Sequence, residues 1–466
     1  MKVYPTILLI NPRATYYREI AQKCYPPLNL LYLAASLRQA GMNAIVIDAN
    51  AMRLSDSEIR SRINEVGDVS IVGFPLHSEM MSEVRALTEI ARSALPKATI
   101  VLGGPHATAL PDDTLNEYPD VDFILRGECE DVFPAFARVC AEGGDYSSLH
   151  GVSYREGVET RHCPTPQPPD ISRIPFPARD LLDQAYREGR YYSLMIRTRP
   201  VETMLTSRGC PFRCSFCYNT KRTYRFRAAD DVFNELVGIH ERGIDTVEIV
   251  DDNFSVDRSR SLELFGLLKK EKLRMRFRIK CRVDSVDEEF LLRARDAGVY
   301  QVSYGMESGV QELLDAMRKG TTVEQNAKAC AMTKAAGMAC HTSWIVGFPG
   351  DTPERIWQTV GFIRSIAPTT VNIEFLKPYP FTEVYMQAKE KGMLVNDWTS
   401  RSEAIPWVKL QWMKDKCDVE HLLRRIYRSI YLRPRYIWQF GSLALLEGNM
   451  LIARYALQQF AKTIRN

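Results

Sequence analysis

The sequence predicts an α/β protein with a doubly wound parallel sheet at its N-terminus, an open six-stranded barrel after it, and a helical C-terminal region. Short apolar runs alternate with helical patterns over residues 1–150 and again over 203–390. This alternation is typical of parallel sheets covered by helices. A proline-rich stretch without periodicity, residues 151–202, separates the two series and is expected to be a linker. Residues 391–466 form the last region.

The composition is that of a folded protein. At 466 residues the chain is long enough for about three domains, and a net charge of +4 does not indicate a nucleic-acid partner. The 11 cysteines are scattered except for one group, so we expect a reducing compartment rather than a disulfide framework. Residues 1–10 read as a strand and not as a signal peptide. No run approaches the roughly 20 apolar residues of a membrane span, so we expect a cytoplasmic protein.

The first region is expected to form a flavodoxin- or Rossmann-like sheet. The predicted strands are 7–10, 44–47, 70–73, 99–102 and 123–125, and the predicted helices are 28–40, 55–65, 80–93 and 113–117. Such a sheet binds ligands at the carboxyl ends of its strands, near the point where the strand order reverses. Asn11, His77 and Ser78 lie in loops of this kind, as does the segment Gly103-Gly104-Pro-His106-Ala-Thr108. Adjacent glycines allow a ligand to approach the backbone closely.

Three cysteines lie at Cys-x3-Cys-x2-Cys spacing, at Cys210, Cys214 and Cys217, just after a predicted strand end. Such a compact triad can hold three irons of a four-iron cluster and leave the fourth iron open. Three core cysteines on one helix face are the alternative, but Gly209 and Pro211 argue against a continuous helix. A zinc site normally has four ligands, and no fourth cysteine or histidine lies nearby. The pattern therefore favours the cluster.

Six strand–helix repeats follow from residue 203. The strands are expected to begin near Thr203, Thr246, Arg276, Gln301, His341 and Val371, with helices between them, as at 228–241 and 310–317. Six repeats are too few to close an eight-stranded barrel, so a partial (β/α)6 TIM barrel is expected. Its functional side chains should lie at the carboxyl ends of the strands.

The cysteine triad resembles the signature of the radical S-adenosylmethionine (SAM) superfamily, with Phe216 as the aromatic residue before the last cysteine. The resemblance implies that Cys210, Cys214 and Cys217 ligate one 4Fe-4S cluster. It also implies that SAM binds the open iron and is reductively cleaved to a 5′-deoxyadenosyl radical. A reductant such as flavodoxin or ferredoxin would supply the electron.

The residues that end the later strands match this family in order. The implied SAM contacts are Phe216, Asp251, Asp252, Arg282, Glu307, Ser308 and Gly347. One of the two aspartates is expected to accept a hydrogen bond from the SAM ammonium, and the arginine to pair with its carboxylate. Glu307 and Ser308 are expected to hold ribose hydroxyls, and the glycine to pack on adenine. The alternative for any single residue is a cap of the following helix.

In front of such a core, residues 1–150 resemble the cobalamin-binding domain of cobalamin-dependent radical SAM enzymes. The segments 103–108 and 126–130 match that family's Gly-Gly-x-His-x-Thr and Gly-Glu-x-Glu patterns. The Asp-x-His-x-x-Gly motif that supplies a cobalt-ligating histidine in methionine synthase-type domains is absent. His77 lies near where a residue could approach the lower face of cobalamin, or is a loop histidine bonded to backbone. The expected cobalamin contacts are Asn11, His77, Ser78, Gly103, Gly104, His106, Thr108, Gly127 and Glu128.

The last region carries a basic helical segment. Its arginines are Arg424, Arg425, Arg428, Arg433 and Arg435. They form either a surface for an acidic partner or membrane headgroups, or the solvated face of a helix whose apolar stripe packs on the barrel.

The resemblance implies a class B radical SAM methyltransferase that methylates an unactivated carbon of a peptide, protein or natural product, using the deoxyadenosyl radical and methylcobalamin. An unactivated C–H bond lacks the electron pair that ordinary methyl transfer from SAM needs. A non-methylating enzyme of the same plan is the alternative, for oxidative cyclisation, ring contraction or lipid tailoring. A cobalamin or iron–sulfur sensor is the remaining one. The sequence does not indicate the substrate or the catalytic residues.

Overall fold

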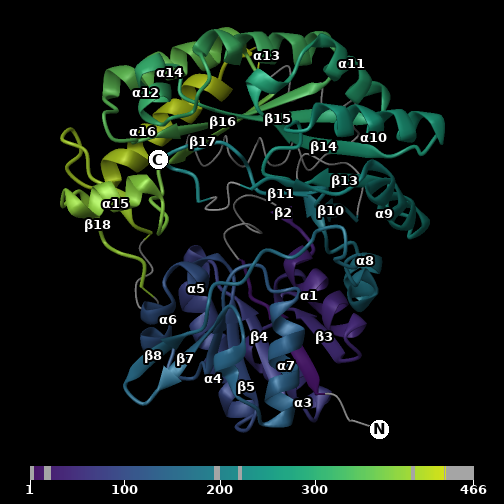
Figure 1. Cartoon of the computed structure of the whole chain (residues 1–466). Coiled ribbons are helices and arrows are strands. Elements are labelled where there is room, and N and C mark those ends of the chain that lie inside the picture. Colours follow the sequence, from purple (N-terminus) through teal and green to yellow (C-terminus); the bar gives the residue numbers. More distant parts are fainter. Residues whose placement is uncertain are drawn as a thin grey trace. The chain divides into compact units, whose positions relative to one another are not determined.

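The structure is a computed structural model that describes residues 5–14, 23–193, 200–218, 223–399, 405–434 and 436. The chain divides into two compact units. The first contains Met1–Tyr192 together with Asp397–Ile405, and the second contains Ser193–Asn396 together with Pro406–Asn466. Each unit is built on its own largely parallel sheet (Figure 1). The predicted α/β class is therefore confirmed.

The first unit contains a seven-stranded sheet of order β3-β1-β4-β5-β6-β7-β8. Its strands are β1 (Thr6–Asn11), β3 (Asn43–Asp48), β4 (Ile71–Pro75), β5 (Thr99–Gly103), β6 (Phe123–Leu125), β7 (Val152–Glu156) and β8 (Glu159–His162). The helices are α1 (Leu28–Gln39), α2 (Ala49–Met52), α3 (Asp56–Val66), α4 (Met81–Ala94), α5 (Pro105–Ala109), α6 (Pro111–Glu117), α7 (Val132–Glu142) and α8 (Asp183–Arg187). Short strands β2 (Lys23–Cys24) and β9 (Tyr192–Ser193) complete this part of the chain.

The order of the first five strands of this sheet creates a switch point between β1 and β4. These strands are parallel, and the chain adds β3 on one side of β1 and β4 on the other. All five residues of β4 are buried, as expected of a strand covered on both faces by helices. The carboxyl ends of β1 and β4 therefore flank the crevice in which such sheets bind ligands.

Two strands lie in the stretch that the sequence assigned to the linker. β7 and β8 form an antiparallel hairpin that joins the sheet beside β6. Gly157, at φ 65°, lies in its turn. The residues of β8 are mostly exposed, so the apolar alternation that reveals a strand in a sequence is weak here.

The second unit contains a six-stranded parallel sheet whose spatial order follows the chain: β10 (Glu202–Met204), β13 (Thr246–Ile249), β14 (Arg276–Cys281), β15 (Val299–Glu307), β16 (Ala339–Val346) and β17 (Thr370–Phe375). Helices α9 (Ala229–Glu241), α10 (Arg258–Lys270), α11 (Glu288–Asp296), α12 (Gln311–Ala316), α13 (Val323–Ala335) and α14 (Pro353–Ile366) alternate with the strands. Among the described residues the sheet does not close, since its edge strands β10 and β17 do not pair with each other. The predicted partial barrel is confirmed.

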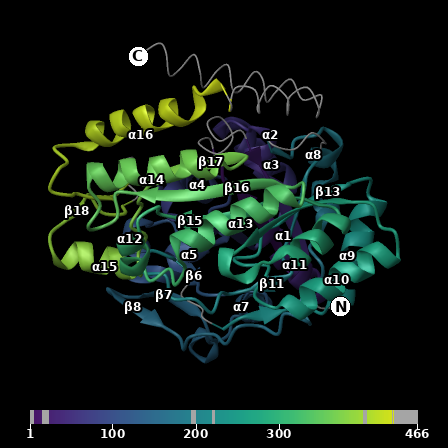
Figure 2. The ribbon, with the colours of Figure 1, turned by 90° about the horizontal axis from the view of Figure 1, so that it is seen from above.

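The last elements pack on the β17 side of this sheet. They are α15 (Glu383–Glu390), the paired strands β18 (Leu394–Val395) and β19 (Trp407–Val408), and α16 (Lys416–Tyr431). Figure 2 shows α16 running beside α14. Ile426 and Ile430 of α16 are fully buried, so its apolar stripe packs on the barrel. The predicted surface role of its arginines stays a prediction, and Arg435 lies outside the described residues.

Two tyrosines of α16 satisfy the backbone of the edge strand β17. The Tyr427 hydroxyl accepts a hydrogen bond from the Ile373 amide and donates one to its carbonyl, both at 3.0 Å. The Tyr431 hydroxyl does the same with Val371, at 3.1 and 2.7 Å. The two rings stack at 5.9 Å between centroids. An edge strand presents unpaired amides and carbonyls, so α16 covers this edge in place of a seventh strand.

None of the helices among the described residues has the length and apolar character that a membrane crossing requires.

Replacing both tyrosines, Tyr427→Phe with Tyr431→Phe, should lower the free energy of unfolding. The backbone groups of two β17 residues would lose their partners, at a cost of about 1–3 kcal/mol. Denaturant unfolding followed by circular dichroism measures the loss. Tyr385→Phe is the control, because its hydroxyl meets Lys389 of its own helix. An equal loss in the control would contradict the role given to α16.

Candidate active site

The cysteine triad lies in a loop, residues 209–218, after β10 and the short strand β11 (Ser207–Arg208). Cys210 and Cys214 are half-buried and Cys217 is exposed. Cys140 is also half-buried, whereas Cys24, Cys129, Cys163, Cys281, Cys330 and Cys340 are buried. The triad does not lie on a helix, so the alternative of three core cysteines on one helix face is wrong. The structure thus groups three accessible thiols within eight residues of chain.

The arrangement of these thiols fits a cluster better than a single ion. In the described part of the chain, no three His, Cys, Asp or Glu side chains converge as ligands of one metal ion. Zinc needs such convergence. Three thiolates can instead each bind a different iron of a cluster. The donor set therefore fits the predicted 4Fe-4S cluster.

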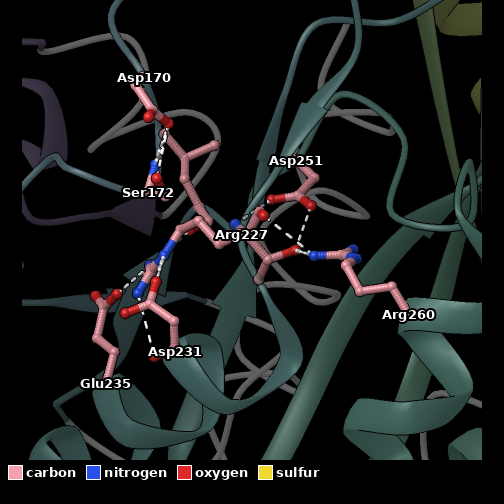
Figure 3. Close-up of polar contacts among 9 residues, drawn as sticks. Asp170, Ser172, Arg227, Asp231, Glu235, Asp251 and Arg260 are labelled. Atoms are coloured by element: carbon pink, nitrogen blue, oxygen red, sulfur yellow. Dashed lines mark hydrogen bonds and ion pairs between the residues drawn. The ribbon is translucent and has the colours of Figure 1, made fainter.

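Asp251, just after β13, fixes the chain that leads into the cysteine loop. It is fully buried. Its Oδ1 accepts a hydrogen bond from the Thr206 amide at 2.7 Å, and its Oδ2 accepts from the hydroxyls of Thr206 and Ser207, both at 2.5 Å. Arg260 of α10 donates to the Thr206 carbonyl and hydroxyl at 3.1 and 2.9 Å (Figure 3). Both oxygens of Asp251 are thus engaged inside the protein, which gives this residue a positioning role.

A second group of charges holds the start of α9 to the same segment. Arg227 bonds to Asp231 at 2.6 Å, pairs with the buried Glu235, and donates to the Leu205 carbonyl at 3.1 Å (Figure 3). Leu205 directly precedes Thr206, so α9 and α10 both fix the residues before the triad.

Asp252 lies next to this buried carboxylate but is exposed. Desolvation by the surrounding protein raises the pKa of Asp252, while Lys280, and a hydrogen bond from the Gly209 amide, act in the opposite direction. Asp252 is therefore the accessible carboxylate at this strand end, and the predicted contact with the SAM ammonium fits it better than Asp251.

Asn253, which the sequence analysis missed, is buried, and its Nδ2 has no hydrogen-bond partner among the described residues. Its only signal in the sequence was its place after a strand.

Arg282, at the end of β14, contacts the cysteine loop through an aromatic ring. Its guanidinium lies 3.6 Å from the ring centroid of Phe212, a cation–π geometry. Its Nε and Nη2 bond to the Asp284 carboxylate at 3.0 and 2.9 Å, and Nη2 also donates to the Lys319 carbonyl at 2.9 Å. The guanidinium is thus already paired, and its contact with the SAM carboxylate stays a prediction.

Lys319 is the second residue that the sequence analysis missed. Its Nζ lies 2.8 Å from Glu307 Oε1, with both side chains 9% exposed, and 6.0 Å from the centroid of Phe216. Burial acts to lower the pKa of Lys319, but the charges of Glu307 and Cys214 outweigh it, and the pKa is raised. Lys319 is therefore positively charged and lies between Glu307, the residue predicted to bind ribose, and the cysteine loop.

The backbone of β15 allows this pair to form. Glu307 has φ 61°, and the register with β16 shifts between Gly305 and Glu307. A Cβ at Gly305 would collide with the Glu307 carboxylate. The glycine is therefore needed for the side chain of Glu307 to fold back onto its own strand. A left-handed conformation in a residue other than glycine costs about 1–3 kcal/mol and is found most often at functional sites.

The last two predicted SAM contacts are packed inside the unit. Ser308 is 1% exposed, and its hydroxyl accepts a hydrogen bond from the Val310 amide at 3.1 Å. Gly347 donates its amide to Asp351 Oδ2 at 2.9 Å, and a Cβ there would collide with the ring of Phe375. Their contacts with ribose and adenine stay predictions.

In the first unit, the loops after β4 and β5 are locked together. The Leu76 amide donates to the Gly103 carbonyl at 2.7 Å, and the His106 amide donates to the Leu76 carbonyl at 3.1 Å. Gly104 has φ 95°, and a Cβ there would lie 2.9 Å from the Leu76 oxygen. The paired glycines predicted from the sequence therefore serve the contact between two loops.

Most of the other predicted cobalamin contacts pair with one another. Ser78 Oγ lies 2.9 Å from His106 Nδ1, and Thr108 Oγ1 accepts a hydrogen bond from the Gly127 amide at 3.0 Å. Glu128 follows this glycine and is half-buried. Asn11, at the end of β1, donates to the buried Asp48 at 2.8 Å. The structure thus brings the loops after β4, β5 and β6 together, and contact with cobalamin stays a prediction for each residue.

His106 is 1% exposed. Desolvation lowers the pKa of His106 to about 4, with Asp397 opposing and His77 adding to the effect. Asp397 belongs to the segment Asp397–Ile405, which returns to the first unit after the barrel. His106 is therefore neutral at physiological pH, and His77, in contrast, is exposed.

Comparisons with known proteins identify a domain in each unit. The B12 binding domain matches residues 17–137, and the Radical SAM superfamily matches residues 204–363. An uncharacterised methyltransferase of Pyrococcus horikoshii is 29% identical over 94% of each chain. The anaerobic magnesium-protoporphyrin IX monomethyl ester cyclase of Rubrivivax gelatinosus is 28% identical over 92% of this chain and 78% of its own. The structure of TsrM from Kitasatospora setae, a radical SAM methyltransferase with cobalamin and a [4Fe-4S] cluster bound, is similar in fold, with a TM-score of 0.75, 17% identity, and coverage of 93% of this chain and 90% of its own.

The two domains define an enzyme that combines B12 with radical SAM chemistry. The chain belongs to the cobalamin-dependent radical SAM enzymes, and its cofactors are a 4Fe-4S cluster, SAM and cobalamin.

Replacing any triad cysteine, as in Cys214→Ala, should abolish the iron–sulfur absorbance and the formation of 5′-deoxyadenosine, because the cluster loses one of three protein ligands. Anaerobic reconstitution, iron analysis and mass spectrometry measure both. Cobalamin binding should persist, since the triad lies in the second unit. Cys140→Ala, at another half-buried cysteine, is the control and should keep its iron. A triad variant that still cleaves SAM would show that the triad is not the cluster site.

His106 should make the protein less stable in acid. A histidine with a lowered folded-state pKa stabilises the fold above its unfolded value of about 6.5 and loses that contribution as the pH falls toward 4. The loss is at most about 3 kcal/mol over this window. His106→Asn should have a smaller loss than wild type in unfolding experiments from pH 7 to pH 4, whereas His150→Asn, at an exposed histidine, should follow wild type. Equal losses in all three proteins would contradict the assignment.

Proposed function

We propose that the protein is a methyltransferase that methylates an unactivated carbon of its substrate. The observation that carries the proposal is the presence, in one chain, of three accessible thiols at the strand ends of a partial barrel and of a B12 binding domain. A relative named as a methyltransferase matches along 94% of both chains. These features support methyl transfer because a carbon without an available electron pair needs both a hydrogen-abstracting group and a separate methyl donor.

When bound, the cluster with SAM supplies hydrogen-atom abstraction, and methylated cobalamin supplies the methyl group. The residues of the chain bind and position these groups. In the proposal, Cys210, Cys214 and Cys217 ligate the cluster, and Asp251 and Arg260 fix the chain before them.

The residues at the next strand ends would bind SAM. Asp252 would accept a hydrogen bond from its ammonium, and Glu307 would bind ribose while Lys319 balances its charge. Asp252 and Glu307 are placed by their own strand ends, and Lys319 by the segment after α12, so the geometry is preorganised before SAM arrives. An external reductant such as flavodoxin or ferredoxin would supply the electron.

A cyclase is the second candidate. It is favoured by the relative named as an anaerobic magnesium-protoporphyrin IX monomethyl ester cyclase, which matches along 92% of this chain. The same residues would bind the cluster and SAM in either reaction, so the candidates differ in what happens to the substrate after hydrogen abstraction.

The products of SAM distinguish the two candidates. The reconstituted protein, incubated anaerobically with SAM, methylcobalamin, a reductant and extracts fractionated by size, should form 5′-deoxyadenosine and S-adenosylhomocysteine in the same fraction. A substrate should gain the mass of one methylene group, which becomes labelled when the SAM methyl group carries deuterium. 5′-Deoxyadenosine without S-adenosylhomocysteine, with a product that contains no additional carbon and no deuterium from the SAM methyl group, would support the cyclase and overturn methylation.

A further inference from the structure

We infer that the imidazole of His77 is an axial ligand to the cobalt of bound cobalamin. The inference rests on cobalamin as the cofactor of the first unit and adds a metal ligand to it.

The first step is the position of His77. It follows β4 by two residues, at the carboxyl end of the strand that forms the switch point with β1. Ligands of doubly wound sheets bind in the crevice at this switch point, outside the carboxyl ends of the strands. His77 is thus in one of the two loops that flank this crevice. It takes this place from the β4 loop, so it does not need the absent Asp-x-His-x-x-Gly motif.

The second step is the rigidity of the backbone around it. The Leu76 amide donates a hydrogen bond to the Gly103 carbonyl at 2.7 Å, and the Leu76 carbonyl accepts one from the His106 amide at 3.1 Å. The His77 carbonyl itself accepts a hydrogen bond from the Met80 amide at 2.9 Å. A ligand side chain on such a fixed backbone loses little conformational freedom when it binds.

The third step is that the side chain of His77 makes no hydrogen bond within the described part of the chain. Its ring has no hydrogen-bond partner among the residues that the structure describes, and it is exposed. The other histidine at this edge, His106, is 1% exposed and lies 2.9 Å from Ser78 Oγ. A histidine held by the fold would resemble His106, whereas the described residues provide no hydrogen-bond partner for either ring nitrogen of His77.

The fourth step is its chemistry. A metal binds the lone pair of neutral imidazole. The ordinary pKa of a histidine side chain is about 6.5, so its ring offers that lone pair at physiological pH.

Electron paramagnetic resonance of the cob(II)alamin form tests the inference on the whole protein. Axial nitrogen splits the cobalt signal, into a triplet for nitrogen-14 and a doublet for nitrogen-15. Protein made with nitrogen-15 histidine and loaded with unlabelled cobalamin should therefore give doublets where unlabelled protein gives triplets. Triplets in the labelled protein would assign the nitrogen to the cofactor's own base, and an unsplit signal would exclude any nitrogen ligand. Either result would overturn the inference.

Variants localise the signal. His77→Ala should bind cobalamin but lose the splitting, and added imidazole should restore it. His150→Ala, at an exposed histidine elsewhere in the first unit, should keep the wild-type spectrum. Splitting that survives in His77→Ala would overturn the inference. Cobalamin content, measured by absorbance after extraction, separates this result from a wild-type protein that binds no cobalamin, which would overturn the cofactor together with its ligand.

Discussion

The second unit depends on one buried carboxylate. Asp251 accepts three hydrogen bonds from Thr206 and Ser207, the residues that lead into the cysteine loop. A buried carboxylate is costly unless donors surround it, so the bonds and the burial require each other. Arg260 binds the same threonine and supplies the opposite charge. The loop can therefore keep its thiols accessible without a helix or a strand of its own.

In both units, residues at the end of one strand hold the loop that follows a different strand. Arg282 and Lys319 contact the cysteine loop from β14 and from the segment after α12. In the first unit, Leu76 is bonded to the loop after β5. Parallel strands bring their carboxyl ends to one edge, so residues far apart in the chain act on a single loop. This edge is where each unit would bind its cofactor.

The sequence predicted the elements well because buried parallel strands are continuous apolar runs, and β1, β3 and β6 match their expected places closely. It predicted the cysteine triad from spacing alone. It did not predict the inward contacts of Asp251 and Ser308, because a carboxylate or hydroxyl after a strand has the same pattern whether it binds protein or ligand. No pattern in the sequence indicated a role for Lys319. Its partner Glu307 lies twelve residues away, and the pair depends on the left-handed backbone conformation of Glu307, which the sequence does not reveal.

Bound iron in two neighbouring aspartate variants tests the central claim most directly. Asp251→Ala removes the acceptor for three hydrogen bonds before the cysteine loop, whereas Asp252→Ala removes an exposed carboxylate beside it. After anaerobic reconstitution, and with folding checked by circular dichroism, Asp251→Ala should bind much less iron than wild type. Asp252→Ala should bind as much iron as wild type. A folded Asp251→Ala protein with a full cluster would contradict the account.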